Sequence, residues 1–376
     1  MDFDYTVMPI AIVVIALAVD VLCLRYLVLL SRKALTLRGK LIRSVLPFAA
    51  VLLVTFVASS SAYNAIASHL FWAKRPPGGR FEMVNGYRMY INCTGSGSPT
   101  LVLGAELGGD SVDWGQLQPV LSRTTRVCSW DRAGFGWSQA VPGPQDADHI
   151  ANELHLLLTK AGVTGPLVLM GHSIAGLYIR DYAVLYPSEV AGLIFVDSSS
   201  PFQNRSPAMR SRGLKPPSWL LRLAMIVGVP RLIGMCSYHG NGPDAEFQTM
   251  RKEDICRIHY EALSAELRAF DESSGEVGRS HGFGSLPILV FSHDPLGPVP
   301  RRAQPEAVEA TQRAWNEMQE NLKTLSTRSR RVIVTGSSHQ LFEERPGLVE
   351  TDVTEFIQQI RAAAPQPSDY GSTKRE

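Results

Sequence analysis

The sequence has no marked excess of charge of either sign and, over one long stretch, no charged residue at all. Its 376 residues include 37 Lys and Arg against 35 Asp and Glu, a net charge of +2. A nucleic-acid-binding domain usually carries a basic surplus, so we expect no nucleic-acid partner. Lys, Arg, Asp and Glu are all missing between Ser44 and Ala73, which is typical of a membrane span.

Two apolar stretches near the N-terminus are long enough to cross a bilayer, which takes about 20 residues. They cover 7–30 and 44–73, and only Asp20 and Arg25 interrupt the first. Asp20 would cost about 2.5–3.5 kcal/mol near the centre of a span, so we expect it to face the other helix or to lie toward an end. A buried or interfacial helix is the alternative for the first stretch. A secretory signal in the second is disfavoured, because the segment before its Ser60-Ser61-Ala62 site is too long.

The segment between the two stretches is basic. It contains no acid, and its cations are Arg32, Lys33, Arg38, Lys40 and Arg43, whereas Asp2 and Asp4 precede the first stretch. The positive-inside rule then places this segment in the cytoplasm and both chain ends outside. The sequence therefore predicts a multi-pass cell-membrane protein, with residues 1–75 as its anchor and the main domain extracytoplasmic.

Strand-like and helix-like segments alternate through residues 76–363, which we expect to form one large domain. Buried-type strands are predicted at 80–93 (a hairpin around Asn85-Gly86), 100–105, 125–130, 167–170, 190–196, 286–292 and 331–334, and the longer helices near 146–161, 305–325 and 347–363. Such alternation favours an α/β fold, a mostly parallel sheet with helices on both faces. Residues 198–284 break the pattern and are predicted to form a cap over the carboxyl ends of the strands. The polar tail 364–376 is expected to be disordered.

The segment Leu167–Tyr178 has the layout of a nucleophile elbow. Four apolar residues predict a buried strand, Ser173 follows, and a helical pattern begins directly after it. Gly171 precedes the serine by two positions, and Ala175 and Gly176 follow it, so strand and helix can approach closely. The usual pattern has Gly where this chain has Ala175. Such a turn exposes one hydroxyl above the edge of the sheet.

A serine needs a base that is held in one orientation. His339 follows the last predicted strand and Asp294 follows the preceding one, so both belong at the same edge as Ser173. The order serine, acid, histidine is that of an α/β-hydrolase triad. Asp197 also ends a strand and is the rival acid, although we expect it to be structural. His172 and His281 are not expected to act as the base.

The developing oxyanion requires two N–H donors. We expect one from Ile174, directly after the nucleophile, and the other from Leu107 in the glycine-rich turn after the 100–105 strand. Glu106 stands beside that turn, and its carboxylate would oppose an anion unless it turned toward solvent or an arginine, or were neutral. The sequence predicts that Glu106 points away from Ser173.

From about residue 80 to 363 the chain resembles the α/β-hydrolase-fold superfamily, in particular its serine esterases and lipases. The motifs that carry the resemblance are Gly171-His172-Ser173-Ile174-Ala175-Gly176, Leu107-Gly108-Gly109-Asp110-Ser111, Asp131-Arg132-Ala133-Gly134-Phe135-Gly136 and Gly336-Ser337-Ser338-His339. Because the second and fourth strands are neighbours in that fold, the resemblance implies a Cys93–Cys128 disulfide. Cys236 and Cys256 would then close a loop in the insert, as suits an oxidising compartment; four reduced thiols are the alternative.

The combined features predict a membrane-anchored serine hydrolase that cleaves small-molecule or lipid carboxylic esters through an acyl-enzyme. Neither a cofactor nor a metal ion is expected. Amide or peptide hydrolysis, or acyl transfer, would use the same three residues. A membrane-tethered binding protein on an inactive hydrolase fold is the alternative from another class. The sequence does not indicate the acyl group, the leaving group or the oligomeric state.

Overall fold

The computed structural model describes residues 7–33, 36–74, 78–141, 143–201, 203–210, 219–242, 244–256, 260–279, 282–295 and 305–363. Asp2, Asp4, His281 and the tail 364–376 lie outside these ranges. The contacts separate the chain into two compact units. The first contains Met1–Gly78, Arg132–Gly143 and Lys215–Arg268, and the second contains Gly79–Asp131, Pro144–Leu214 and Ala269–Glu376.

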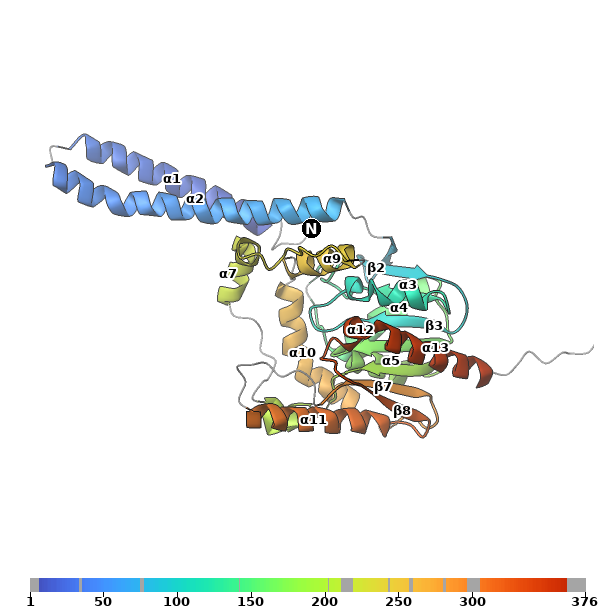
Figure 1. The fold of residues 1–376 in the computed structure, drawn as a ribbon. Helices are drawn as coiled ribbons and strands as arrows, with labels where there is room; N and C mark the ends of the chain where they lie inside the picture. Colours follow the sequence, from blue (N-terminus) through green and yellow to red (C-terminus); the bar gives the residue numbers. More distant parts are fainter. Residues whose placement is uncertain are drawn as a thin grey trace, which may run out of the picture. The chain divides into compact units, whose positions relative to one another are not determined.

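The helices and strands follow one another as Figure 1 shows. In chain order they are α1 (Met8–Ser31), α2 (Leu37–Ala73), β1 (Arg80–Val84), β2 (Tyr87–Thr94), β3 (Thr100–Gly104), η2 (Ser111–Trp114), α3 (Leu117–Leu121), β4 (Val127–Trp130), α4 (Ala147–Lys160), β5 (Leu167–His172), α5 (Ala175–Leu185), β6 (Val190–Val196), η3 (Gln203–Arg205), α6 (Pro207–Arg210), α7 (Trp219–Val227), α8 (Val229–Leu232), α9 (Ala245–Ile255), α10 (Tyr260–Gly278), β7 (Ile288–His293), α11 (Pro305–Lys323), β8 (Ser329–Val334), α12 (Leu341–Glu344) and α13 (Pro346–Ala363).

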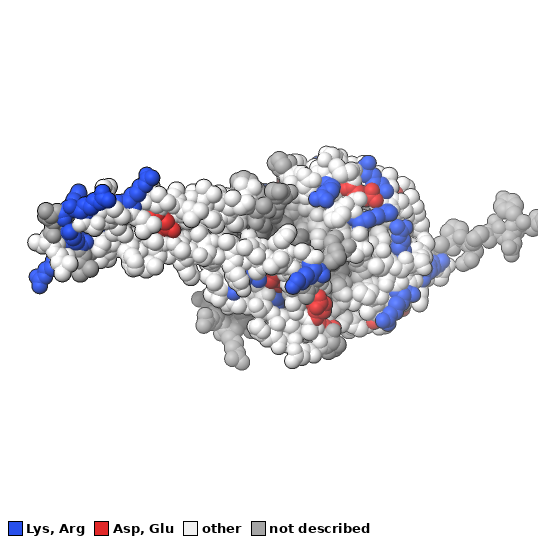
Figure 2. All heavy atoms as spheres, turned by 90° about the horizontal axis from the view of Figure 1, so that it is seen from above, with Lys and Arg blue, Asp and Glu red and all other residues white. Residues whose placement is uncertain are grey.

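In the first unit, α1 and α2 pack against each other as a helical hairpin (Figure 1). Both are long and apolar enough to cross a membrane, by length and composition. The Thr36 hydroxyl caps the start of α2 by accepting a hydrogen bond from the Gly39 N–H at 3.2 Å. Asp20 faces the other helix, as expected, and its Oδ2 accepts a hydrogen bond from Thr55 Oγ1 at 3.0 Å. Figure 2 shows Lys and Arg gathered at the end of the hairpin where the predicted basic segment joins the two helices.

The first unit also contains most of the insert. Within it, α2 contacts α7 and α8, and Ser68 of α2 donates a hydrogen bond to Glu253 of α9. Cys236 and Cys256 form a disulfide within this part of the insert. Arg132, two residues after the end of β4, is buried and forms an ion pair with the buried Glu266 of α10. The guanidinium lies 4.7 Å from the centre of the Phe135 ring. A buried charge is tolerated only with such a partner.

In the second unit, the described strands form one eight-stranded sheet in the order β1-β2-β4-β3-β5-β6-β7-β8. β1 and β2 pair antiparallel, as do β2 and β4, and the remaining neighbours are parallel. The carboxyl ends of β3, β5, β6, β7 and β8 therefore meet at one edge. Cys93 and Cys128 are opposite each other in the β2–β4 register and form the disulfide that the resemblance implied.

Alternation along the parallel strands separates two hydrophobic cores. Leu167 and Leu169 belong to one core, with the inner faces of α4 and α5, whereas Val168 and Met170 belong to the other, with α3 and α13. Successive side chains of a strand point to opposite faces, so a strand buried on both sides reads as a continuous apolar run. The predicted α/β architecture, a mostly parallel sheet with helices on both faces, is confirmed.

Candidate active site

The chain makes a tight turn between β5 and α5, and Ser173 is at its apex. The φ angle of Ser173 is +53°, in the left-handed region that residues with a Cβ rarely adopt. A Cβ at Gly171 would lie 2.7 Å from the Ala175 carbonyl group, and one at Gly176 would lie 2.4 Å from the Ser198 Cβ. Only glycine fits at these two positions, so the predicted elbow is present.

The main chain of Ser173 is held on both sides. Its N–H donates to the Val196 carbonyl at 3.1 Å, and its carbonyl accepts from the N–H of Ser199 at 2.8 Å. Among the described residues, its hydroxyl makes no hydrogen bond. A strained backbone with a fixed main chain and an uncommitted side chain is the arrangement expected of a nucleophile.

The acid that contacts His339 is Asp197. Its Oδ2 accepts a hydrogen bond from His339 Nδ1 at 2.5 Å. Oδ1 accepts from Trp315 Nε1 at 2.8 Å and from the His293 main-chain N–H at 3.1 Å, and His293 Nδ1 also lies within 2.9 Å of both oxygens. The Asp197 side chain is fully buried, whereas that of His339 is 38% exposed. The imidazole is therefore anchored on its inner nitrogen.

This contact network shifts the pKa of both partners. Burial alone would raise the pKa of Asp197, but its hydrogen bonds to His293 and His339 outweigh burial and hold it far below the usual range. Burial would lower the pKa of His339, but the hydrogen bond and the charge of Asp197 raise it above the ordinary value of 6.5. Asp197 is thus a permanent carboxylate that fixes the hydrogen of His339 on Nδ1 and leaves Nε2 to accept a proton.

Asp294, which the sequence analysis assigned to this contact, binds elsewhere. Its Oδ2 accepts a hydrogen bond from the main-chain N–H of Gly336 at 2.9 Å, at the start of the loop that carries His339. Asp197 leaves β6 with a φ of +44°, and its carboxylate, not that of Asp294, meets Nδ1. The assignment of the two acids is therefore reversed: Asp294 supports the loop, and Asp197 holds the imidazole.

The two expected oxyanion donors lie at the same edge. Ile174 precedes α5 and Leu107 follows β3 by three residues. Among the described residues, neither main-chain N–H has a hydrogen-bond partner. The first N–H groups of a helix are unsatisfied within the helix and carry partial positive charge. Both N–H groups remain available to a ligand.

The Glu106 carboxylate, which the sequence predicts to point away from Ser173, contacts Gln340, His339 and His172. Its Oε1 accepts a hydrogen bond from Gln340 Nε2 at 2.7 Å, and its Oε2 lies 3.9 Å from His339 Nε2 and 3.8 Å from His172 Nδ1. The carboxylate therefore lies beside the nitrogen that would serve as the base. Its negative charge contributes to the raised pKa of His339.

His172 is a buried, neutral imidazole. Burial lowers its pKa to about 4, and its Nε2 lies 3.0 Å from the His339 carbonyl, which can only accept. The hydrogen is therefore on Nε2, and Nδ1, which makes no hydrogen bond, lies 3.8 Å from Glu106 Oε2. One nitrogen each of His172 and His339 and one oxygen of Glu106 lie within 4.8 Å of one another. These three groups could hold a divalent metal ion.

His293, Gln312 and Trp315 also belong to this hydrogen-bond network and were not predicted from the sequence. His293 is the last residue of β7, beside Asp197 at the same edge, and its Nε2 lies 2.7 Å from Gln312 Oε1. Burial would lower the pKa of His293, but Asp197 and Gln312 raise it. A polar residue at the end of an apolar strand was the available signal for His293. Gln312 and Trp315 are on α11, and nothing in its helical pattern marked them.

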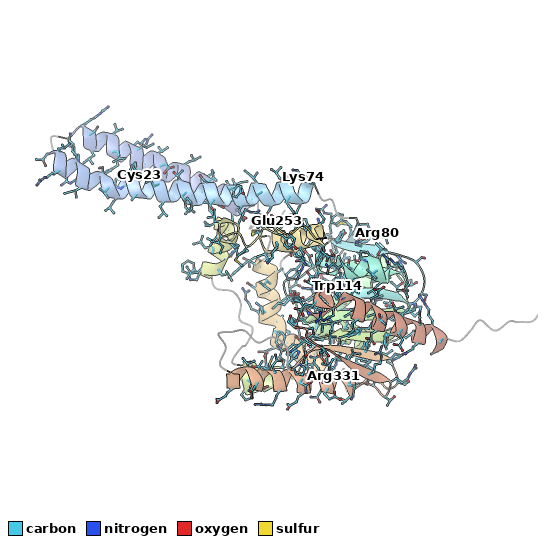
Figure 3. The ribbon with its side chains drawn as sticks, in the orientation of Figure 1. Cys23, Lys74, Arg80, Trp114, Glu253 and Arg331 are labelled. Carbon is cyan, nitrogen blue, oxygen red and sulfur yellow. A yellow bond between two sulfur atoms is a disulfide. The ribbon has the colours of Figure 1, made fainter. Side chains whose placement is uncertain are left out.

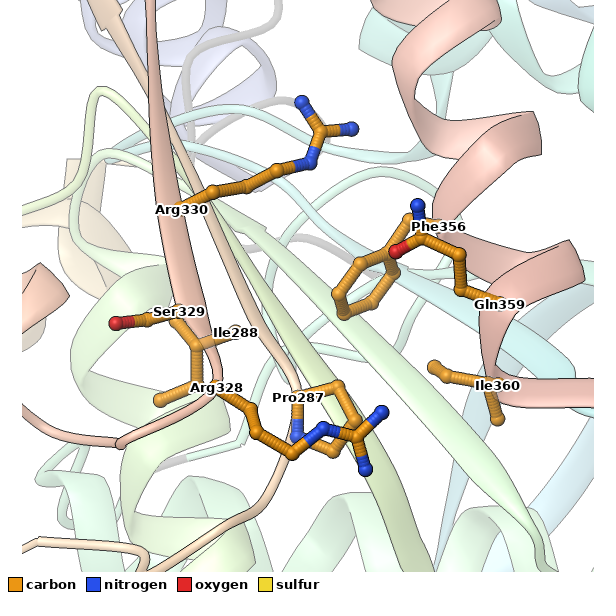
Figure 4. A pocket seen from close by; sticks show the side chains of 8 residues that line it. All are labelled: Pro287, Ile288, Arg328, Ser329, Arg330, Phe356, Gln359 and Ile360. Atoms are coloured by element: carbon orange, nitrogen blue, oxygen red, sulfur yellow. The ribbon is translucent and has the colours of Figure 1, made fainter. Parts of the chain in front are cut away.

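A cavity of about 290 Å³ lies at the opposite end of the strands (Figure 4). It is lined by Pro287, Ile288, Arg328, Ser329, Arg330, Phe356, Gln359 and Ile360. These residues come from the beginnings of β7 and β8 and from α13, whereas Ser173, Asp197 and His339 follow the ends of strands. This cavity is therefore separate from the candidate active site.

Comparison with known proteins agrees with the architecture. Residues 99–225 match the family model described as the alpha/beta hydrolase fold. The enol-lactonase from Burkholderia xenovorans superposes with a TM-score of 0.52 at 19% identity, over 74% of this chain and 100% of that one. At that identity the likeness shows the fold alone.

Curated relatives match parts of the chain. An uncharacterised protein of Schizosaccharomyces pombe is 43% identical over 84 residues, which is 22% of this chain and 16% of the yeast protein. The (lyso)-N-acylphosphatidylethanolamine lipase of Bos taurus is 22% identical over 279 residues, which is 69% of this chain and 79% of the lipase. The match covers 16% of the yeast protein, 42% of a probable transporter of Hormonema carpetanum and 38% of an uncharacterised protein of Bacillus subtilis. The chain therefore spans less than half the length of these three relatives.

Proposed function

We propose that this chain, which has the α/β-hydrolase fold, is a membrane-anchored serine hydrolase of carboxylic esters. The observation that carries the proposal is the hydrogen bond from His339 Nδ1 to the buried Asp197, at the sheet edge where Ser173 occupies a strained turn. Ser173 is the nucleophile, His339 the base and Asp197 the orienting acid. The fold alone would not support an activity, since it hosts many chemistries.

The reaction follows the acyl-enzyme route. His339 Nε2 takes the proton of the Ser173 hydroxyl as its oxygen attacks the ester carbonyl, and the N–H groups of Leu107 and Ile174 receive the oxyanion. Nε2 then gives the proton to the departing alcohol. Water attacks the acyl-enzyme by the same path and releases the acid. Asp197 remains ionised throughout and stabilises the imidazolium.

Glu106 favours a second candidate, a membrane-tethered binding protein with little turnover. A carboxylate about 4 Å from a developing oxyanion would oppose it by about 4 kcal/mol at an effective dielectric near 20, or roughly a thousand-fold in rate. Glu106 lies beside His339 and also accepts from Gln340, so it is held in place. Amide hydrolysis and acyl transfer would use the same groups and differ only in the substrate pocket.

Covalent labelling tests the proposal. The full-length protein in detergent micelles should react with a fluorophosphonate probe at Ser173 alone, and Ser173→Ala should abolish labelling. Turnover of a p-nitrophenyl ester should fall on the order of a million-fold, as in a related serine protease that loses its nucleophile. Ser199→Ala, a change at a neighbouring buried serine, is the matched control and should retain labelling. Normal ester turnover by Ser173→Ala would exclude this mechanism, and a screen of ester chain lengths would define the acyl group.

A further inference from the structure

Apolar side chains are unusually exposed on the part of the insert that contains α7 and α8. Eight of them, between 37% and 69% exposed, lie within 17 residues: Trp219, Leu220, Leu221, Leu223, Val229, Leu232, Ile233 and Met235. We call them the α7–α8 surface. The cation on α7, Arg222, is paired with Glu261 at 2.7 Å. Exposed apolar side chains gathered in one short segment point to a contact with a protein or a membrane.

The end of α7 is attached to α2 by hydrogen bonds. Ser60 Oγ and Ser61 Oγ donate to the carbonyls of Val227 and Ile226 at 2.5 and 2.9 Å, and Asn64 Nδ2 donates to that of Met225 at 3.4 Å. These are carbonyls that a helix end leaves unsatisfied. α7 also contacts α1. Both helices of the hairpin therefore hold α7, and on α2 the contact lies at Ser60, Ser61 and Asn64.

The length of α2 places this attachment within the bilayer. α2 has 37 residues and is about 55 Å long, whereas the hydrocarbon layer is about 30 Å thick, or about 20 residues. Counted from Ser44, the first residue beyond the basic segment, the hydrocarbon ends at about Tyr63. α1 is apolar along this level too, because Val13 and Val14 line a groove together with Ala62 and Ala65. The residues of α2 that hold α7 thus lie at the far hydrocarbon boundary.

One turn farther along α2, the partners become charged. Arg231 donates to Ser68 Oγ at 2.8 Å and to Asn64 Oδ1 at 2.9 Å, and forms an ion pair with Glu253 of α9. Figure 3 labels Glu253 in this region of α9. Ser68 also donates to Glu253 at 2.9 Å. Along α2, the contacting partner is first the apolar helix α7 and then the Arg231–Glu253 ion pair. A bilayer changes in the same order, from hydrocarbon to charged headgroups.

We propose that the α7–α8 surface lies in the leaflet opposite the basic segment, where lipid acyl chains cover it. This inference rests on the proposed membrane anchoring and names the substrate class of the proposed hydrolase: lipid esters resident in that leaflet. A second copy of the chain could also cover an apolar surface. The acyl chains are favoured because α7 contacts two membrane-length helices at the level of their hydrocarbon.

Fluorescence quenching by lipid tests the location. Single cysteines are introduced into full-length Cys23→Ser protein at Leu220, Leu232, Leu46 of α2 or the exposed Arg268 of α10, labelled with bimane, and reconstituted in phosphatidylcholine–phosphatidylglycerol vesicles. Lipids brominated on their acyl chains should quench the probes at Leu46, Leu220 and Leu232 at least twofold and leave the Arg268 probe unchanged. Quenching at Leu46 alone would overturn the proposal while retaining the anchor. Protection at Leu220 with a concentration-dependent dimer would assign the surface to a second copy.

Turnover supplies an independent measurement. Leu220→Asp with Leu232→Asp should lower hydrolysis of a vesicle-embedded lipid ester at least tenfold and change that of a short soluble ester less than twofold. Met83→Asp, at an exposed apolar residue of β1, is the matched control and should affect neither. Equal losses on both substrates, or no loss on vesicles, would overturn the substrate class. If no ester is hydrolysed at all, the proposed function fails, and the quenching experiment still decides the location of the surface.

Discussion

Replacement of Asp197 by asparagine would separate the two acids at the candidate site. Oδ1 of Asp197 accepts hydrogen bonds from Trp315 Nε1 and from the His293 main-chain N–H, so the amide oxygen of asparagine should take this position. The amide NH2 group would then face His339 Nδ1, which lies 2.5 Å from Oδ2 in the native chain. Because an NH2 group donates, Nδ1 would have to accept, and the hydrogen of His339 would move to Nε2. The base toward Ser173 would be lost.

The expected loss is large for Asp197→Asn and small for Asp294→Asn. In serine proteases the corresponding change lowers turnover by about 10⁴, equivalent to about 5.5 kcal/mol at about 1.4 kcal/mol per tenfold. Asp294→Asn keeps an amide oxygen for the Gly336 N–H, and a charge-assisted hydrogen bond exceeds a neutral one by only about 1 kcal/mol. Turnover should therefore fall less than about tenfold.

Steady-state hydrolysis of p-nitrophenyl butyrate by both variants provides the assay. Thermal melting would show whether each variant is folded, since Asp197 is fully buried. The ranking of the turnover numbers is the result that matters. A ten-thousand-fold loss in Asp294→Asn, together with a small loss in folded Asp197→Asn, would refute the assignment of Asp197 as the orienting acid.

Three further outcomes are expected. Activity needs neutral His339, whose pKa is raised, so the pH profile of kcat/KM should fall on its acid side through a value above 6.5; Glu106→Gln should shift this limb to lower pH, and an unchanged limb would contradict the contact. Zn²⁺ at micromolar concentration should inhibit turnover reversibly by binding Glu106, His172 and His339, because neutral imidazole and carboxylate suit zinc; full activity at 1 mM would exclude the site. Removal of the Cys93–Cys128 bridge by a double alanine substitution should lower the free energy of unfolding by about 2–4 kcal/mol, measured by urea titration, and no change would mean that the bridge is not formed.

The α/β architecture could be predicted because it depends on local patterns. Apolar runs such as Leu167–Met170 must form buried strands, and the alternation with amphipathic helices leaves few arrangements other than a parallel sheet. The elbow was predictable for the same reason, since Gly171 and Ser173 lie within a few residues of each other. Asp20 could be oriented toward α2 because a carboxylate among lipid chains costs too much.

What the sequence by itself determined was which residues lie at the sheet edge; their pairing depended on tertiary structure. Asp197 and Asp294 both follow parallel strands that end there, so strand order could not distinguish them. The choice depends on a φ of +44° at Asp197 and on His293 and Trp315, which lie more than 90 residues away along the chain and donate to the same carboxylate. The contacts of Glu106 could not be predicted for a similar reason, because His172, His339 and Gln340 come from other segments. Side-chain direction at a shared edge is set by non-local hydrogen bonds, and these exist only once the sheet has formed.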